Sequence, residues 1–199
     1  MRIAAGRVAV ALVATALLAA CGGSSSSSSS STPKPSPSPS PSPSPVRIAT
    51  VDACALASAN DASTAAGATL TQIPTGAASA QASICVFGNT AGNSQTAVLI
   101  IASVYPDERT ADAVDVQQLA AAFGGQFGIT GVSNAKVVTG IGDKAVEYTA
   151  TSTSGGGMGM FVFKANVVMF IIVSPASDST KIETLARTCV ANFDKATHT

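Results

Sequence analysis

Cysteine and histidine side chains offer the widest chemistry in this chain of 199 residues, as nucleophiles, metal ligands or bridge partners. Zinc sites use closely spaced Cys and His pairs, and a nucleophilic site needs a base beside the nucleophile. Neither pattern occurs here, because the sequence has no C-x-x-C pair and its single histidine stands next to the end of the chain. We therefore predict no catalytic residue, no metal site and no cofactor from these residues, which are Cys21, Cys54, Cys85, Cys189 and His198.

The best-spaced pair of carboxylates is Asp143 and Glu147. Such a pair can act as acid and base, but Asp143 follows Gly142 in a predicted turn, where aspartate commonly hydrogen-bonds the nearby backbone. The glycine run at 155–157 lacks the Lys and Ser/Thr of a phosphate-binding loop, so we interpret it as a hairpin connection. We therefore predict that the protein is not an enzyme, and a hydrolase with no recognisable motif is the last alternative.

Cys21 ends an N-terminal segment with the pattern of a secretory signal peptide. Residues 1–20 open with Arg2 and Arg7 and continue with an apolar run over 8–20, shorter than the roughly 20 residues that span a membrane. The end of this run, LAAC at 18–21, resembles the lipobox of bacterial lipoproteins. The resemblance implies cleavage before Cys21, a diacylglyceryl group on its sulfur, and an anchor in the cell membrane on the extracytoplasmic side.

Residues 21–45 combine the lipidated cysteine with a Ser-rich and Pro-Ser tract. Such a composition buries too little apolar surface to fold, so we predict a disordered linker. The remaining residues, 46–199, suit one globular domain. Their eight Lys and Arg side chains stand against eleven Asp and Glu, a net charge of −3 with no basic patch. Nucleic acid is therefore not an expected partner.

Three cysteines remain once Cys21 is assigned to the anchor, and three pairings among them are possible. Export makes a disulfide plausible. We favour Cys54 with Cys85, because this bond would join the first helical segment to an early strand and contribute roughly 3 to 4 kcal/mol. Cys189 lies in a helical pattern and is the alternative partner.

The order of patterns along 46–199 is helix, two or three strands, helix, four strands, helix. Ser58 and Asp61 form a capping-box pattern ahead of a helix over 59–66. A second helix is expected from the acidic residues after Pro106 to the glycines at 124–125, and a third carries an apolar stripe over 182–193. Strands that cluster instead of alternating with helices predict an α+β domain, an antiparallel sheet of about five to seven strands packed by two or three helices.

The stretches VDACALASANDASTAAG, CVFG and VTGIGDKAVE, followed by paired strands and a last helix, resemble small uncharacterised lipoprotein domains of actinobacteria and related bacteria. Those domains open with an Asp-x-Cys-x-Leu helix and carry a second Cys near an aromatic residue. The resemblance supports the predicted fold and the pairing of Cys54 with Cys85, and Cys189 departs from the pattern. It implies no activity.

Two neighbouring strand patterns near the C-terminus, GMGMFVF and NVVMFIIV, are apolar at nearly every position. A strand with one face in water alternates apolar and polar residues, so both faces of these strands are expected to be covered. The covering is either ordinary packing or an apolar pocket with adaptable Met and Phe lining. From the pocket we predict a non-catalytic module that binds a hydrophobic or lipid-like envelope ligand, and the alternative is a domain that binds envelope protein or cell-wall polymer. The predicted pocket residues are Met160, Phe161, Phe163, Met169 and Phe170.

Overall fold

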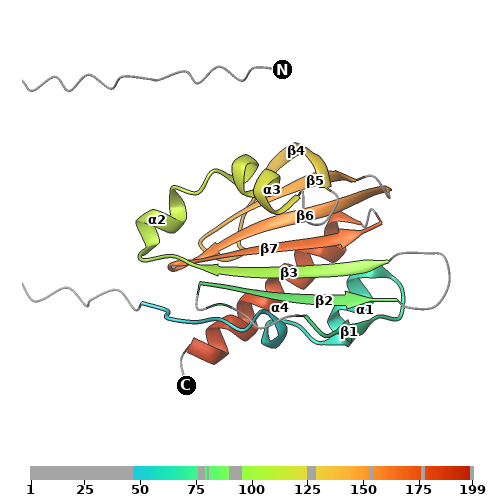
Figure 1. Cartoon of the computed structure of the whole chain (residues 1–199), viewed down its shortest axis with the longest axis horizontal. Coiled ribbons are helices and arrows are strands. Elements are labelled where there is room, and N and C mark those ends of the chain that lie inside the picture. Colours follow the sequence, from blue (N-terminus) through green and yellow to red (C-terminus); the bar gives the residue numbers. More distant parts are fainter. Residues whose placement is uncertain are drawn as a thin grey trace, which may run out of the picture. The chain divides into compact units, whose positions relative to one another are not determined.

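One antiparallel sheet of seven strands organises the computed structural model of the protein (Figure 1). The structure describes residues 47–75, 79, 81–89, 96–124, 129–152, 155–175 and 178–197, within a compact unit, Ser44–Thr199. The predictions for 1–45 (signal peptide, Cys21 and linker) and for His198 therefore lie outside the described residues. The strands are β1 (Thr71–Ile73), β2 (Ala82–Gly88), β3 (Ala97–Val104), β4 (Ile129–Val138), β5 (Lys144–Ser152), β6 (Gly155–Lys164) and β7 (Val167–Ser174).

The order of strands across the sheet is β1-β2-β3-β7-β6-β5-β4. Chain neighbours pair throughout, except that β3 pairs with β7 at the centre of the sheet. This central position explains why β3 and β7 carry almost no polar residues, because both of their faces and both of their edges are covered. The predicted α+β class with an antiparallel sheet is confirmed.

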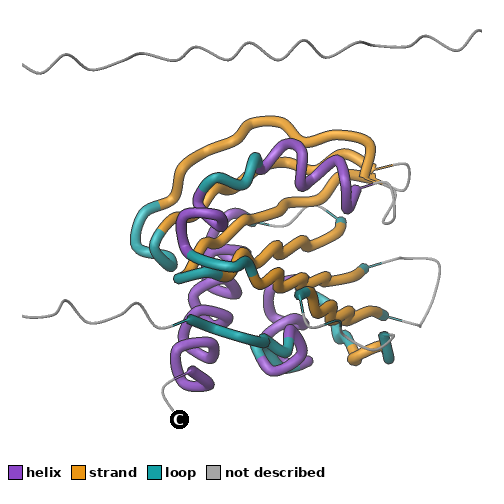
Figure 2. Tube along the Cα trace, turned by 60° about the vertical axis from the view of Figure 1, so that its left-hand side comes forward, coloured by secondary structure: helices purple, strands orange, loops and turns teal. Residues whose placement is uncertain are grey.

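Helices cover both faces of this sheet, as the view in Figure 2 makes clear. The helix α1 (Ala59–Ala66), the 3-10 turn η1 (Ala53–Ala55) and the long helix α4 (Ser179–Thr197) pack on one face. The short helices α2 (Glu108–Asp112) and α3 (Val116–Gly124) lie on the other. Within the described ranges, no helix combines the length and the apolar character that crossing a membrane requires.

The second predicted helix is in fact two helices, and this prediction was wrong in its continuity. Ala113 ends α2, with its N–H bonded to carbonyls of the preceding turn. Asp115 then starts α3, because its carboxylate accepts hydrogen bonds from the N–H groups of Gln117 at 2.8 Å and Gln118 at 3.2 Å. An aspartate that bonds the backbone in this way favours a helix start over a helix interior.

The capping box of the first helix and the apolar stripe of the last helix are present as the sequence predicted, and further side chains and a glycine define the helix ends. The Ser58 and Asp61 side chains each accept a hydrogen bond from the other residue's N–H, and Gly67 ends α1 with a left-handed φ of 68°. Asp178 precedes α4 and accepts from the Thr180 N–H at 2.9 Å. The apolar stripe of α4 is buried at Ile182, Leu185, Ala186, Cys189 and Phe193.

The glycines at 155–157 were predicted as a hairpin connection, but they belong to β6. A Cβ on Gly157 would stand 2.7 Å from the Val173 carbonyl oxygen, so the close approach of β7 requires glycine at this position. The tight hairpin predicted between the last two strands is present, with Ala165 and Asn166 in its turn.

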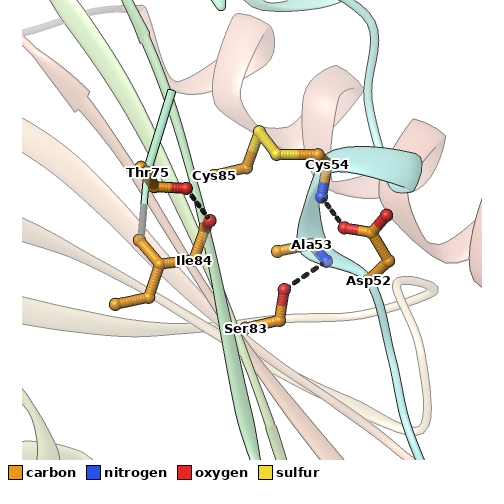
Figure 3. Close-up of a disulfide and its surroundings, with 7 residues drawn as sticks. All are labelled: Asp52, Ala53, Cys54, Thr75, Ser83, Ile84 and Cys85. Carbon is orange, nitrogen blue, oxygen red and sulfur yellow. Dashed lines mark hydrogen bonds between the residues drawn. A yellow bond between two sulfur atoms is a disulfide. The ribbon is translucent and has the colours of Figure 1, made fainter. Parts of the chain in front are cut away.

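A disulfide between Cys54 and Cys85 joins η1 to β2, with 5.0 Å between the two Cα atoms (Figure 3). This confirms the favoured pairing and leaves Cys189 as a buried free thiol in α4. The adjoining backbone is also fixed, because the Ala53 N–H donates to the Ser83 hydroxyl at 2.9 Å. Asp52 caps η1 through the Cys54 N–H. The N-terminal segment is therefore held against β2 by covalent and polar contacts.

Candidate functional site

The five predicted pocket residues are all buried, but they do not share one face of the sheet. Met160 and Met169 belong to the core beneath α1 and α4. Phe161, Phe163 and Phe170 belong to the core beneath α2 and α3. Successive side chains of a strand point to opposite faces, so consecutive residues such as Met160 and Phe161 cannot line the same space. The structure thus brings the three phenylalanines together and separates the methionines from them.

A stacked aromatic cluster occupies the α2–α3 face of the sheet. Phe161 and Phe170 are cross-strand partners whose ring centroids lie 4.4 Å apart with an interplanar angle of 9°. Tyr148 on β5 completes the cluster, with its ring centroid 5.2 Å from that of Phe161 and 5.8 Å from that of Phe170. The Lys144 ammonium lies 4.4 Å from the ring centroid of Phe163. We call Tyr148, Phe161 and Phe170 the aromatic cluster.

Tyr148 is the residue of this site that the sequence prediction missed. The signal was available, because Val146, Tyr148 and Ala150 alternate with more polar residues in KAVEYTATS and place the tyrosine on one face. Its cross-strand partner is Gly159. A Cβ on Gly159 would overlap the phenol carbon and the hydroxyl oxygen of Tyr148, so the absence of a side chain there makes room for the tyrosine ring.

The Tyr148 hydroxyl is buried without a hydrogen-bond partner, and among the described side chains it is the only buried polar atom in this condition. The residue as a whole is 3% exposed. Burial raises the pKa of Tyr148 well above its ordinary value, so the phenol stays neutral and keeps its proton as a donor. An unsatisfied buried hydroxyl costs about 1 to 3 kcal/mol, and a phenylalanine of the same shape would avoid this cost.

The two faces of the sheet are covered by helices that differ in length and in the size of the side chains they bury. On the far face, α4 buries large side chains along its length, among them Ile182, Leu185 and Phe193. On the face of the aromatic cluster, the buried side chains among those described in α2 and α3 are Ala111 and Ala120. Val114, Val116 and Leu119 pack on the same core but stay partly exposed. Short helices whose larger side chains are only partly buried gain less from packing than one long helix that buries large ones. The α2–α3 segment is therefore the more weakly held of the two covers.

The carboxylate pair has structural partners instead of facing a common substrate space. Asp143 accepts hydrogen bonds from the Ala165 N–H at 2.8 Å and from the Lys164 ammonium at 3.2 Å, which holds the β6–β7 turn. Glu147 is buried and accepts from the Ser179 hydroxyl at 2.5 Å at the start of α4. The structural role predicted for Asp143 is therefore present, but its backbone partner belongs to the distant β6–β7 turn and not to its own turn. Glu147 supports the start of α4.

The free thiol lies in the core and is not poised for reaction. Burial, and secondarily the negative charge of Asp61, raises the pKa of Cys189 to about 12. The thiolate is the reactive form of cysteine, so this thiol is inert near neutral pH. Among the described residues, no group of three or more His, Cys, Asp or Glu side chains is arranged to hold a metal ion.

Comparisons with known proteins add no family to this description. No family model matches the chain, no curated protein matches it, and no solved structure matches its fold.

Proposed function

We propose that this protein is a lipid-anchored, extracytoplasmic and non-catalytic module that binds an apolar, lipid-like ligand between the aromatic cluster and the α2–α3 segment. The observation that carries the proposal is the buried Tyr148 hydroxyl without a partner. In an otherwise apolar environment, a neutral donor that destabilises the free protein is best explained by an acceptor supplied from outside. Small-molecule sites commonly combine an apolar lining with a few polar groups in this way.

The chemistry of the cluster defines the class of ligand. The lining favours an acyl chain or a flat hydrocarbon ring system, because it consists of Phe161, Phe170 and neighbouring aliphatic side chains. The neutral phenol donates one hydrogen bond, which suits an ester, a carbonyl or a hydroxyl oxygen. A carboxylate buried at this point would have only that one donor, so a neutral polar group fits better than a charged one.

Entry of the ligand requires the α2–α3 segment to move away from the sheet. Among its described residues, the fully buried side chains of that segment are small and the larger Val116 and Leu119 are only partly buried, and the loop at 113–115 already divides the segment into two short helices. The far face, with α4 and the disulfide, would keep its packing during this motion. The predicted anchor at Cys21 and the linker over 21–45 would hold such a module next to its source of envelope lipids.

A paired substitution tests the proposal on the compact unit, residues 44–199. Tyr148→Phe should weaken binding of a fluorescent fatty-acyl ester about tenfold, because the ligand acceptor loses its donor. The same variant should unfold at an equal or higher urea concentration than the parent chain, since the unsatisfied hydroxyl is gone. Tyr105→Phe is the matched control, because Tyr105 packs at the edge of the same core but is only partly buried, and should change neither value.

Two results would contradict the proposal. One is native mass spectrometry of the chain purified from its own host that detects no bound lipid, together with no binding of the acyl ester. The other is equal loss of binding in the Tyr148 and Tyr105 variants, which would indicate non-specific adsorption to the aromatic surface.

A second candidate function, docking of another envelope protein, has one observation in its favour. The strand β4 forms an edge of the sheet, and its Val137 side chain is 70% exposed. An exposed edge strand can pair with a strand of a partner. Crosslinking in intact cells that recovers lipids and no protein neighbour would argue against this alternative.

A further inference from the structure

A cavity of about 470 Å³ opens at the end of the sheet where three distant segments meet. These segments are the start of the domain, the beginning of α2 and the β6–β7 turn. None of the lining residues belongs to the aromatic cluster, so this cavity is separate from the proposed apolar site. The lining residues are Arg47, Pro106, Asp107, Glu108, Arg109, Ala165 and Asn166.

The base of this cavity is a fixed hydrogen-bond clamp made by the Asn166 side chain, which is 2% exposed. Its amide oxygen accepts from the Ile48 N–H at 2.9 Å, and its amide nitrogen donates to the carbonyls of Ile48 at 2.9 Å and Tyr105 at 2.7 Å. Arg47 precedes one clamped residue and Pro106 follows the other. The clamp therefore positions two walls of the cavity relative to each other before any ligand binds.

Four charged side chains line the cavity, and one of them, Asp107, already has hydrogen-bond partners. Asp107 caps α2 by accepting hydrogen bonds from the Thr110 N–H at 2.8 Å and the Thr110 hydroxyl at 2.9 Å. These two bonds, and to a smaller extent the charges of Arg109 and Arg47, lower the pKa of Asp107. Both guanidinium groups thus lie near enough to act on this carboxylate. Among the ion pairs of the described residues, none includes Arg47, Arg109 or Glu108.

The sum of these charges indicates which class of ligand the cavity can bind. Two arginines and two carboxylates sum to zero, so the cavity does not attract a simple anion from a distance. A molecule that carries both charges gains from the guanidinium groups of Arg47 and Arg109 and from the Glu108 carboxylate, which form no ion pair among the described residues. Arginine presents a planar fork of donors that matches a carboxylate, and a carboxylate such as Glu108 accepts the hydrogen bonds of an ammonium.

We propose that this cavity binds a small zwitterion of the amino acid or short peptide class, with its carboxylate on Arg47 and Arg109 and its ammonium on Glu108. The cavity volume is within the range of about 300 to 1,000 Å³ found for small-molecule sites. The site places a polar ligand at the junction where the predicted linker enters the domain.

Calorimetric titration of the full chain, purified in detergent, tests this proposal with four probes. Alanyl-alanine should bind, whereas its N-acetyl form and its C-terminal amide should each bind about tenfold more weakly, because each lacks one charged contact. Inorganic phosphate should bind no better than the blocked forms.

Substitutions assign each contact. In Arg109→Gln, amidation of the peptide should weaken binding less than in the parent chain, because only Arg47 still contacts the carboxylate. In Glu108→Gln, N-acetylation should no longer weaken binding, as in a double-mutant cycle. Lys136→Gln removes an exposed charge on β4 and is the matched control. Both test residues are exposed, so we expect the variants to keep the melting temperature of the parent.

Three outcomes would overturn the proposal. These are phosphate binding as tight as that of the dipeptide, equal affinity for the free and blocked peptides, and no heat of binding at millimolar dipeptide. None of them bears on the acyl-ester assay, because that assay depends on Tyr148 and no lining residue of this cavity belongs to the aromatic cluster.

Discussion

Replacement of Asn166 by alanine should be among the most destabilising polar-to-alanine changes in this domain. The side chain is buried and makes three hydrogen bonds across two long-range connections, to Ile48 and to Tyr105. Each such bond contributes about 1 kcal/mol net, and its loss leaves buried backbone groups without partners, so the expected cost is about 3 to 4 kcal/mol. For a domain of this size the loss corresponds to a decrease of about 6 to 16 °C in melting temperature.

The measurement is equilibrium urea unfolding of the parent and variant chains, followed by circular dichroism. Asn192→Ala is the matched control, because the Asn192 amide donates only one hydrogen bond, to the Leu56 carbonyl at 3.0 Å, and should cost about 1 kcal/mol. Asn166→Asp keeps the shape and one acceptor but loses both donors, so it should be nearly as costly as alanine. The reasoning is refuted if Asn166→Ala costs no more than Asn192→Ala.

Two further predictions concern the interiors of the two faces. Because burial raises the pKa of Cys189 to about 12, above that of an unfolded thiol, the folded state holds a proton that the unfolded state releases as the pH rises. Stability should therefore fall between about pH 9 and pH 12, and the decrease should be smaller in Cys189→Ala, as measured by urea unfolding across this range. On the other face, Gly159→Ala should cost about 1 to 3 kcal/mol because its Cβ overlaps the Tyr148 ring, and the cost should shrink in a Tyr148→Ala background. Gly156→Ala on the same strand is the control, since its Cβ would approach nothing closer than the Ala150 carbonyl oxygen at 3.8 Å; an equal loss of stability in both glycine variants would contradict the reasoning.

Local signals in the sequence predicted most of the fold. The capping box at Ser58 and Asp61, the apolar stripe of α4 and the turn at 165–166 each act over a few residues, and each is present in the structure. The order of helices and strands followed from these signals and indicated the antiparallel sheet. The pairing of β3 with β7 was not predicted, because it joins segments about 70 residues apart and no local pattern encodes such a neighbour.

The candidate site was predicted only in part, because composition identifies apolar strands but not which face each residue occupies in the assembled sheet. The pattern in β6 and β7 indicated a doubly covered pair of strands, and this is what the structure contains. Met160 and Phe161 are adjacent in β6 and belong to different cores. Assigning each to its core requires the alternation of side chains to be applied residue by residue. Tyr148 entered the site through a cross-strand contact with Gly159, which depends on the register of β5 against β6.

The two faces of the sheet differ in how firmly they are attached to the N-terminal segment of the domain. The far face unites α4, the disulfide to η1 and the Ser83 contact, so the segment that leads from the predicted linker into the domain is secured there. A pull transmitted through the linker would first load Ile48 and the Asn166 clamp, then the Cys54–Cys85 bridge. The α2–α3 segment lies on the opposite face, away from the disulfide and the Ser83 contact, and the Asn166 clamp holds only Tyr105, which precedes α2. If the proposed function holds, α2 and α3 would move to admit the ligand while the disulfide and the Asn166 clamp keep the N-terminal segment attached to the domain.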